Sequence, residues 1–213
     1  MGRGTVYPSG VALIYVVMAS LLEPYRGAAD NRIYRFKRSI SSFLGTFYPD
    51  KTLVVVSDGC PTTSELCHTI YKDFLTLIET ERHTPHSGLV RQAGIDYVHS
   101  VCAPGDIVAY LDTDDEIGQD HLKKIQEHFG DNDWILWDMT YRSPDGDVIL
   151  EAAPFFERCG AGGLAHRADL DITWPSGYGN DGRLVESLAG CDLTYEIFHD
   201  MQYYIHHSID WTT

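Results

Sequence analysis

The chain has 213 residues, 44% of them hydrophobic, and a formal net charge of −15 at pH 7. A chain of this size can bury one substantial core, so we expect one domain over residues 1–213. The acidic balance argues against a protein that binds nucleic-acid backbones through its general surface. An anionic ligand would need a divalent metal or a few convergent arginine side chains between it and the acidic protein.

The cysteines and the apolar runs are typical of a cytoplasmic protein. The five cysteines are scattered and include no Cys-x-x-Cys pair, so the pattern predicts free thiols rather than a disulfide framework or a zinc site. The only long apolar run, residues 11–22, is too short to span a bilayer. We therefore expect a soluble protein in which this run is a buried strand.

Apolar runs alternate along the chain with segments of helical periodicity. The predicted strands are residues 10–18, 52–56, 107–111 and 134–141, with a turn at 144–147 and a return strand near 148–150. The predicted helices are residues 33–43, 62–77, 89–101, 119–129 and 183–188. This alternation indicates a doubly wound, mostly parallel sheet in which the later strands pair antiparallel.

Acidic side chains stand where two of the predicted strands end. Asp58 follows the second strand, and Asp112, Asp114 and Asp115 follow the third. Ligands of such sheets bind outside the carboxyl ends of the strands. Mg²⁺ and Mn²⁺ prefer oxygen ligands and leave room for substrate phosphates, so a divalent cation would relieve the repulsion within the cluster. The alternative is a solvated acidic turn.

Three segments of the chain carry recognisable motifs. They are Val54-Val-Val-Ser-Asp-Gly-Cys60, Arg91-Gln-Ala-Gly-Ile95 and Ile107-Val-Ala-Tyr-Leu-Asp-Thr-Asp-Asp115. In this order they resemble the second-strand motif, the Arg-Asn-x-Gly-Ile element and the strand followed by the Asp-x-Asp signature of family-2-type glycosyltransferases of the GT-A fold. The resemblance implies an α/β fold with a single GT-A-like doubly wound mixed sheet flanked by helices. It also implies a nucleotide-binding half of about 1–116 and an acceptor- and metal-completing half of about 117–213.

The resemblance implies roles for the first half of the chain. Asp58 would contact the base or ribose of a nucleoside diphosphate, and Asp112 would lie near the ribose and the metal. Asp114 would ligate the Mn²⁺ or Mg²⁺ that bridges the phosphates, whereas Asp115 would hold the loop or reach the donor sugar. Arg91 would contact the nucleotide or lie solvated on the helix surface. A UDP-sugar is the favoured donor.

Two departures from the motifs leave the identity of the base open. Ser57 stands where the family often has Asp, and Gln92 where it commonly has Asn.

The second half carries weaker signals. The glycine-rich stretch 160–166 is either a flexible connection or, at Gly162 and Gly163, backbone that approaches the donor sugar closely. The resemblance places His166 and Trp174 near the donor as well. His206 and His207 follow an apolar strand, so one should point to each face, and either is a candidate third metal ligand or a structural histidine.

Asp181 is the candidate general base, although it could equally cap the helix that follows. Asn180 stands where the family usually has Glu. Together these features predict a metal-dependent transfer of a sugar from a nucleoside-diphosphate sugar to an acceptor hydroxyl, with inversion. The alternatives are a catalytically silent nucleotide- or sugar-binding domain and a sugar-nucleotide pyrophosphorylase. The acceptor stays open between a saccharide, a lipid-linked sugar, a protein and a modified nucleic-acid base, and so does the oligomeric state.

Overall fold

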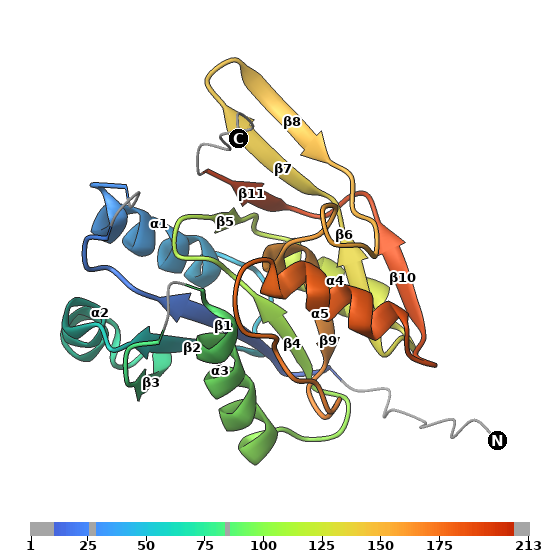
Figure 1. Cartoon of the computed structure of the whole chain (residues 1–213), viewed down its shortest axis with the longest axis horizontal. Coiled ribbons are helices and arrows are strands. Elements are labelled where there is room, and N and C mark those ends of the chain that lie inside the picture. Colours follow the sequence, from blue (N-terminus) through green and yellow to red (C-terminus); the bar gives the residue numbers. More distant parts are fainter. Residues whose placement is uncertain (1–10, 26–28, 84–85, 207–213) are drawn as a thin grey trace.

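A mixed seven-stranded sheet forms the centre of the computed structural model, which describes residues 11–25, 29–83 and 86–206 (Figure 1). The strand order is β10-β6-β9-β4-β1-β2-β3. Strands β4, β1, β2 and β3 run parallel, and β9 is antiparallel to both β4 and β6. The strands are β1 (Ile14–Ser20), β2 (Lys51–Asp58), β3 (Leu75–Thr80), β4 (Ile107–Tyr110), β6 (Trp134–Trp137), β9 (Leu164–Arg167) and β10 (Tyr195–Phe198). The predicted fold class, a doubly wound mixed sheet flanked by helices, is confirmed.

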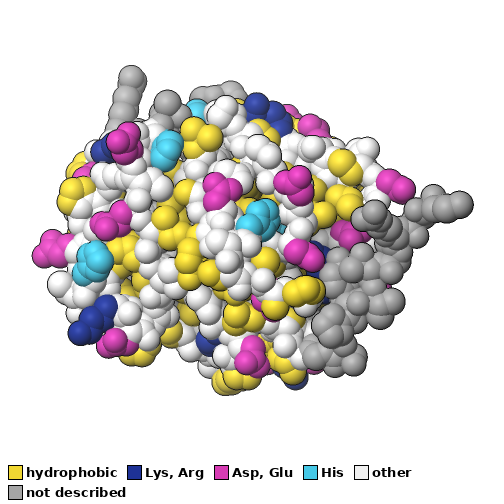
Figure 2. All heavy atoms as spheres, turned by 90° about the horizontal axis from the view of Figure 1, so that it is seen from below, with side chains coloured by type: hydrophobic (Ala, Val, Ile, Leu, Met, Phe, Trp, Pro, Cys, Tyr) yellow, Lys and Arg dark blue, Asp and Glu magenta, His cyan; other side chains and the backbone are white. Residues whose placement is uncertain are grey.

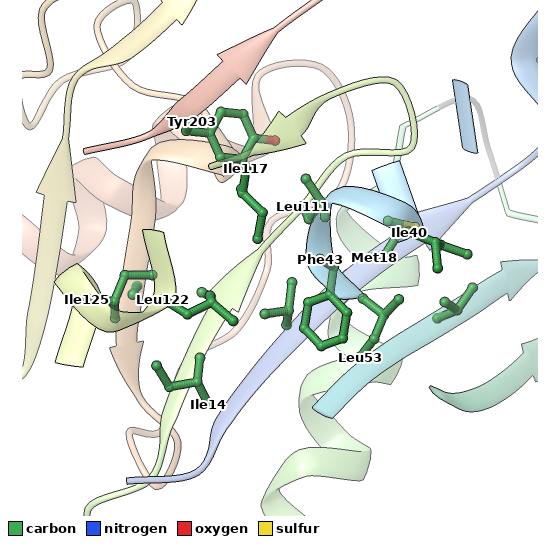
Figure 3. Packing of buried hydrophobic residues seen from close by; sticks show 14 of the residues in the cluster. Ile14, Met18, Ile40, Phe43, Leu53, Leu111, Ile117, Leu122, Ile125 and Tyr203 are labelled. Atoms are coloured by element: carbon green, nitrogen blue, oxygen red, sulfur yellow. The ribbon is translucent and has the colours of Figure 1, made fainter. Parts of the chain in front are cut away.

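Helices cover both faces of this sheet. Consecutive residues of β1 contribute alternately to two hydrophobic clusters, as a strand buried on both faces requires. The cluster of Ile14 and Met18 packs against α1 (Arg32–Leu44) and α4 (His121–Phe129), and Figure 3 shows part of it. The opposite cluster packs against α3 (Gly88–Val101) and α5 (Asn180–Ala189).

A smaller four-stranded sheet, in the order β5-β11-β7-β8, lies beside the region into which β4 runs (Figure 1). Its strands are β5 (Glu116–Ile117), β7 (Met139–Ser143), β8 (Gly146–Leu150) and β11 (Tyr203–Ile205). Strands β7 and β8 form an antiparallel hairpin, and β11 pairs parallel with β7 and antiparallel with β5. The last described strand, β11, therefore lies against β5, which directly follows the acidic residues Asp112, Asp114 and Asp115.

The predicted helix over residues 62–77 is wrong in its second half. Helix α2 (Pro61–Leu66) continues as a π-helical turn, η1 (Cys67–Tyr71), and the chain then enters β3. The apolar residues Ile70 and Phe74 of the predicted helix are 48% and 57% exposed, so they do not belong to a buried helix face. The helical spacing was coincidental, because Leu75 and Leu77 pair with β2 as residues of an edge strand.

The predicted strand over residues 134–141 is two strands in two different sheets. The break falls at Asp138, whose carboxylate accepts a hydrogen bond from Ala152 N at 2.7 Å and lies 2.8 Å from His199 Nδ1. A buried carboxylate with partners on both sides holds the chain at the point where it changes sheets.

Acidic side chains are spread over one face of the molecule, with basic side chains only at isolated places (Figure 2). In the part of the chain that the structure describes, no helix is both long and apolar enough to cross a membrane.

Candidate active site

The carboxyl ends of β2 and β4 bring two acidic positions to one edge of the large sheet. Asp58 is the last residue of β2, and Asp112 follows β4 by two positions. Strand β1 lies between β2 and β4 in parallel register, so the two backbones are separated by about 10 Å. One ligand bound at this edge can therefore contact both carboxylates.

Asp58 lies in the wall of a cavity of about 290 Å³. The residue is only 5% exposed, and its Oδ1 accepts a hydrogen bond from the backbone N of His83 at 2.7 Å. The ring Nδ1 of His83 is 3.0 Å from the same oxygen, so both contacts with His83 involve Oδ1. Arg32, Arg82 and His86 also line this cavity, which makes its wall basic in an acidic protein.

Residues 112–115, which we call the aspartate loop, are anchored through Asp115. Its Oδ2 accepts a hydrogen bond from the hydroxyl of Tyr203 at 3.0 Å, and its Oδ1 accepts one from the backbone N of His206 at 3.1 Å. The same Tyr203 hydroxyl accepts from the backbone N of Asp112 at 3.1 Å, and Ser39 Oγ donates to the Asp112 carbonyl at 2.9 Å. Asp115 is 2% exposed and so holds the loop, one of the two roles that the sequence left open.

Three arginines of α1 approach this edge, and the sequence reasoning did not find them. Arg35 Nη1 lies 3.7 Å from Asp114 Oδ2 and donates to the His206 carbonyl at 3.5 Å. Arg38 Nη2 donates to the Asp114 carbonyl at 2.6 Å. Arg32 stands one turn earlier and lines the basic cavity. The Arg-x-x-Arg-x-x-Arg spacing was the available signal, since residues three apart share a helix face.

The aspartate loop has oxygen donors suited to a divalent cation. The side chains of Asp112 and Asp114 are 36% and 34% exposed, so both carboxylates are open to a ligand. Among the described residues, no three or more His, Cys, Asp or Glu side chains form a cluster that could hold a metal. Mg²⁺ is commonly bound through one or two carboxylates plus substrate phosphates, and this donor set fits that pattern.

Of the two histidines predicted as candidate metal ligands, the structure describes only His206. His206 Nε2 lies 2.5 Å from Glu116 Oε2, so in this arrangement its ring pairs with a carboxylate of β5. Burial lowers the pKa of His206, and so does the nearby Arg38, whereas Glu116 raises it. His207 lies outside the described residues.

Arg91 connects the aspartate loop to the helix that carries the candidate base. Its Nη2 donates to Asp112 Oδ1 at 2.6 Å, and its Nη1 donates to Asn180 Oδ1 at 3.2 Å and to Ser87 Oγ at 2.6 Å. Its guanidinium also lies 4.9 Å from the ring centroid of Trp174. The residue is 5% exposed, so the surface position that the sequence allowed is wrong. Burial opposes the charge of Arg91, but Asp112 and then Asp181 raise its pKa above the ordinary value.

A second cavity, of about 550 Å³, contains both Asp112 and Asp181 in its wall. Asp181 lies in the first turn of α5, whose N-cap is Gly179, so Asp181 is not the cap of this helix. Its Oδ1 accepts a hydrogen bond from the backbone N of Gly182 at 2.9 Å. Burial, and after it the charges of Asp181 and Glu186, raise the pKa of the Cys159 thiol in the same wall to about 12. Carboxylates predominate among the charged residues that line the second cavity, so this cavity is acidic, whereas the first cavity is basic.

The glycine-rich stretch forms a short 3₁₀ helix, η2 (Ala161–Gly163), of which Ala161 and Gly162 line the second cavity. A Cβ on Gly162 would lie 2.1 Å from Tyr203 Cζ, and one on Gly163 would lie 3.0 Å from the Trp137 carbonyl. Tyr203, whose hydroxyl anchors Asp115, fills the space beside Gly162, and the Trp137 carbonyl lies beside Gly163. Close packing within the protein therefore explains why both positions are glycine.

His166 and Trp174 are core residues rather than donor contacts. His166 Nε2 is 2.7 Å from the Tyr110 hydroxyl, which accepts a hydrogen bond from Trp174 Nε1 at 3.1 Å. His166 Nδ1 lies 2.8 Å from the carbonyl of Arg167 and must donate to it, so the hydroxyl donates to Nε2. Burial lowers the pKa of His166 to about 4 and keeps the ring neutral.

The sequence pattern of glycosyl transferase family 2 matches residues 29–172, which is more than half of the chain. The chain belongs to this family. The match spans Asp58, Arg91 and the aspartate loop.

Solved structures of TarS from S. aureus share the fold. The crystal structure of TarS 1–349 aligns with a TM-score of 0.66 at 19% identity and covers 91% of this chain and 60% of that one. The complex of TarS 1–349 with UDP-GlcNAc aligns with a TM-score of 0.64 at 18% identity over 92% of this chain and 59% of that one. The chain thus spans about three-fifths of these TarS chains. None of the curated proteins compared with the chain matches it.

Proposed function

We propose that the chain is a metal-dependent glycosyltransferase that moves a sugar from a nucleoside-diphosphate sugar to an acceptor hydroxyl, with inversion. The observation that carries the proposal is the pair of cavities of opposite charge at one sheet edge, with the aspartate loop in the wall of the acidic one. An anionic donor fits the basic cavity, and a proton-accepting carboxylate stands in the acidic one.

The first half of the chain, about 1–116, binds the donor. The Asp58 carboxylate accepts from the base or the ribose in the basic cavity, and Arg32 and Arg82 face the negative charge of the diphosphate. A UDP-sugar is the first donor to test, and a TarS structure aligned with this chain is a complex with UDP-GlcNAc. Arg91 acts on the donor indirectly, by fixing the Asp112 carboxylate.

Asp112 and Asp114, whose side chains are 36% and 34% exposed, would hold Mn²⁺ or Mg²⁺ beside the diphosphate. When bound, the metal neutralises charge on the departing nucleoside diphosphate. Arg35 contacts both the Asp114 carboxylate and the His206 carbonyl, so Asp114 and His206 lie near each other. His206 would be the third ligand if its ring left Glu116, and His207 is the alternative.

The second half, about 117–213, completes the site, with Asp181 as the general base. The acceptor oxygen forms a bond to the anomeric carbon while the bond from that carbon to the diphosphate oxygen breaks. The electron pair of the broken bond leaves with the nucleoside diphosphate, and the acceptor proton goes to Asp181. Gly162 and Gly163 form the backbone behind this site, and a single displacement of this kind inverts the anomeric centre.

The proposed reaction takes place in the cytoplasm. All five cysteines, each within the described residues, are free, which suits a reducing compartment.

The experiment is the release of UDP from a panel of UDP-sugars, with and without Mn²⁺, by the unmodified chain and by matched variants. Asp181→Asn should lower transfer by roughly 10²-fold or more and leave UDP binding in place. Asp114→Asn should remove the response to Mn²⁺, while Asp120→Asn, at the N-cap of α4, should behave as the unmodified chain. Nucleotide binding without release of UDP in any condition would instead identify a silent binding domain.

A further inference from the structure

Two exposed aromatic residues lie in segments that also line the acidic cavity, since Phe155 shortly precedes Glu157 and Tyr178 shortly precedes Asp181. Tyr178 is 78% exposed and Phe155 is 50% exposed. The ring centroid of Tyr178 lies 6.4 Å from that of Phe156 and 6.1 Å from that of His86, which lines the basic cavity. Tyr178 therefore lies near His86 of the basic cavity and also near Phe156, which directly precedes Glu157 in the wall of the acidic cavity. An aromatic face in this position packs well against the apolar C–H face of a sugar ring.

The charges of the acidic cavity select against anions. The described residues in its wall include five carboxylates and a single guanidinium, that of Arg158. Arg158 is already paired, since its Nη2 lies 3.4 Å from Glu151 Oε2 and its Nε donates to the Glu151 carbonyl at 3.1 Å. Glu157 and Asp181 lie in the same wall. Because the metal proposed at Asp112 would already be paired with the donor diphosphate, a phosphate or sulfate group on the acceptor would have no cation to receive it, whereas hydroxyl groups would donate to these carboxylates.

We infer that the acceptor is an uncharged saccharide that packs on Tyr178 and Phe155 and presents a hydroxyl to Asp181. The inference rests on the proposed transferase function and adds the substrate class of its second site. The lining also has an apolar part, Met139, Ile149, Leu150 and Ile205, as a cavity that receives a ring with both hydroxyl and C–H surface should have.

The test measures transfer from the radiolabelled UDP-sugar that gives the fastest release of UDP. The acceptors are an array of uncharged oligosaccharides and the same oligosaccharides carrying phosphate or sulfate. We expect label on uncharged members and at least about tenfold less on their charged counterparts at about 0.01 M salt, with a smaller difference at about 1 M salt. Equal or greater labelling of the charged members would overturn the inference. So would labelling of no saccharide while UDP release continues.

A charge reversal separates the local field of the cavity from the net charge of the chain. Glu157→Lys should raise kcat/KM for a phosphate-bearing acceptor relative to its uncharged partner by about tenfold. The matched control is Glu127→Lys, which makes the same charge change on the exposed surface of α4 and should leave that ratio unchanged. An equal effect of the two variants would overturn the inference. If no UDP-sugar releases UDP in the unmodified chain, the proposed function itself has failed, which is a distinct outcome.

Discussion

Replacing Arg91 by Met tests whether one buried guanidinium holds the two halves of the site together. The change removes hydrogen bonds to Asp112, Asn180 and Ser87 while keeping much of the side-chain volume. Breaking a buried ion pair costs about 3–5 kcal/mol, but the Asp112 side chain is 36% exposed and regains water. Asn180 is 6% exposed and loses a donor, which costs about 1–3 kcal/mol. We expect a net loss of about 3 kcal/mol.

For a chain of this length, that loss lowers the unfolding temperature by about 9 °C. The assay combines thermal unfolding with transfer measured well below the transition. Transfer should fall by roughly 10²-fold, because Asp112 and the helix of Asp181 both lose their common anchor.

Arg167→Met is the matched control for this variant. Arg167 is also a buried arginine, 4% exposed, and donates to the carbonyls of Asn132 and Gly105, but it pairs with Ile107 at the start of β4, away from the aspartate loop. This control should lose comparable stability and keep its transfer activity at low temperature. Equal activities of the two variants would refute the reasoning about Arg91.

Three further predictions follow from single contacts. Gly162→Ala would place a Cβ 2.1 Å from Tyr203 Cζ, so we expect a loss of about 2 kcal/mol in urea unfolding and weaker transfer. Gly190→Ala, which meets only carbonyls at 3.4 Å and beyond, should be tolerated, and equal stabilities of the two variants would contradict the packing account. The pKa of His166 is lowered to about 4 from 6.5, so its contribution to stability is full above about pH 6.5 and falls by about 3 kcal/mol as the pH drops toward 4, and the buried His121, whose pKa is lowered to about 3, adds to this loss. A urea midpoint that stays constant between about pH 7.5 and 4.5 would show this to be wrong. Asp58→Asn should raise the KM for a UDP-sugar by roughly tenfold or more with little change in kcat, and an unchanged KM would remove Asp58 from the donor site.

The strands that position the site were predictable because each is buried on both faces. Ile107–Tyr110 is a continuous apolar run, and its end placed Asp112 at the carboxyl edge without further information. Residues 75–80 were not recognised as a strand, because β3 is a half-buried edge strand whose apolar residues happen to continue the spacing of the preceding helix. Periodicity cannot separate these alternatives in so short a run.

Which side chains meet across elements could not be predicted from spacing. In α3 the apolar residues Leu89 and Val101 are 42% and 48% exposed, whereas the charged Arg91 is buried. Its partners Asp112 and Asn180 lie 21 and 89 positions away in the chain, so only the folded arrangement joins them. In contrast, the three arginines of α1 share a face at a regular spacing and were within reach of sequence reasoning.

In the proposed function, the division of charge between the two cavities would let an acidic protein bind an anionic donor. The basic wall is local, and the exposed carboxylates of Asp112 and Asp114 would hold a cation only together with the diphosphate. Donor and metal should therefore bind cooperatively, because the diphosphate supplies oxygen ligands to the metal and the metal supplies positive charge to the diphosphate.

The most direct test of the proposed function is a crystal structure of the chain with UDP and Mn²⁺. It should show the uracil or the ribose at Asp58 in the basic cavity, and a metal between the diphosphate and Asp114. A nucleotide bound in the acidic cavity beside Asp181, or a diphosphate with no metal at Asp114, would contradict this account.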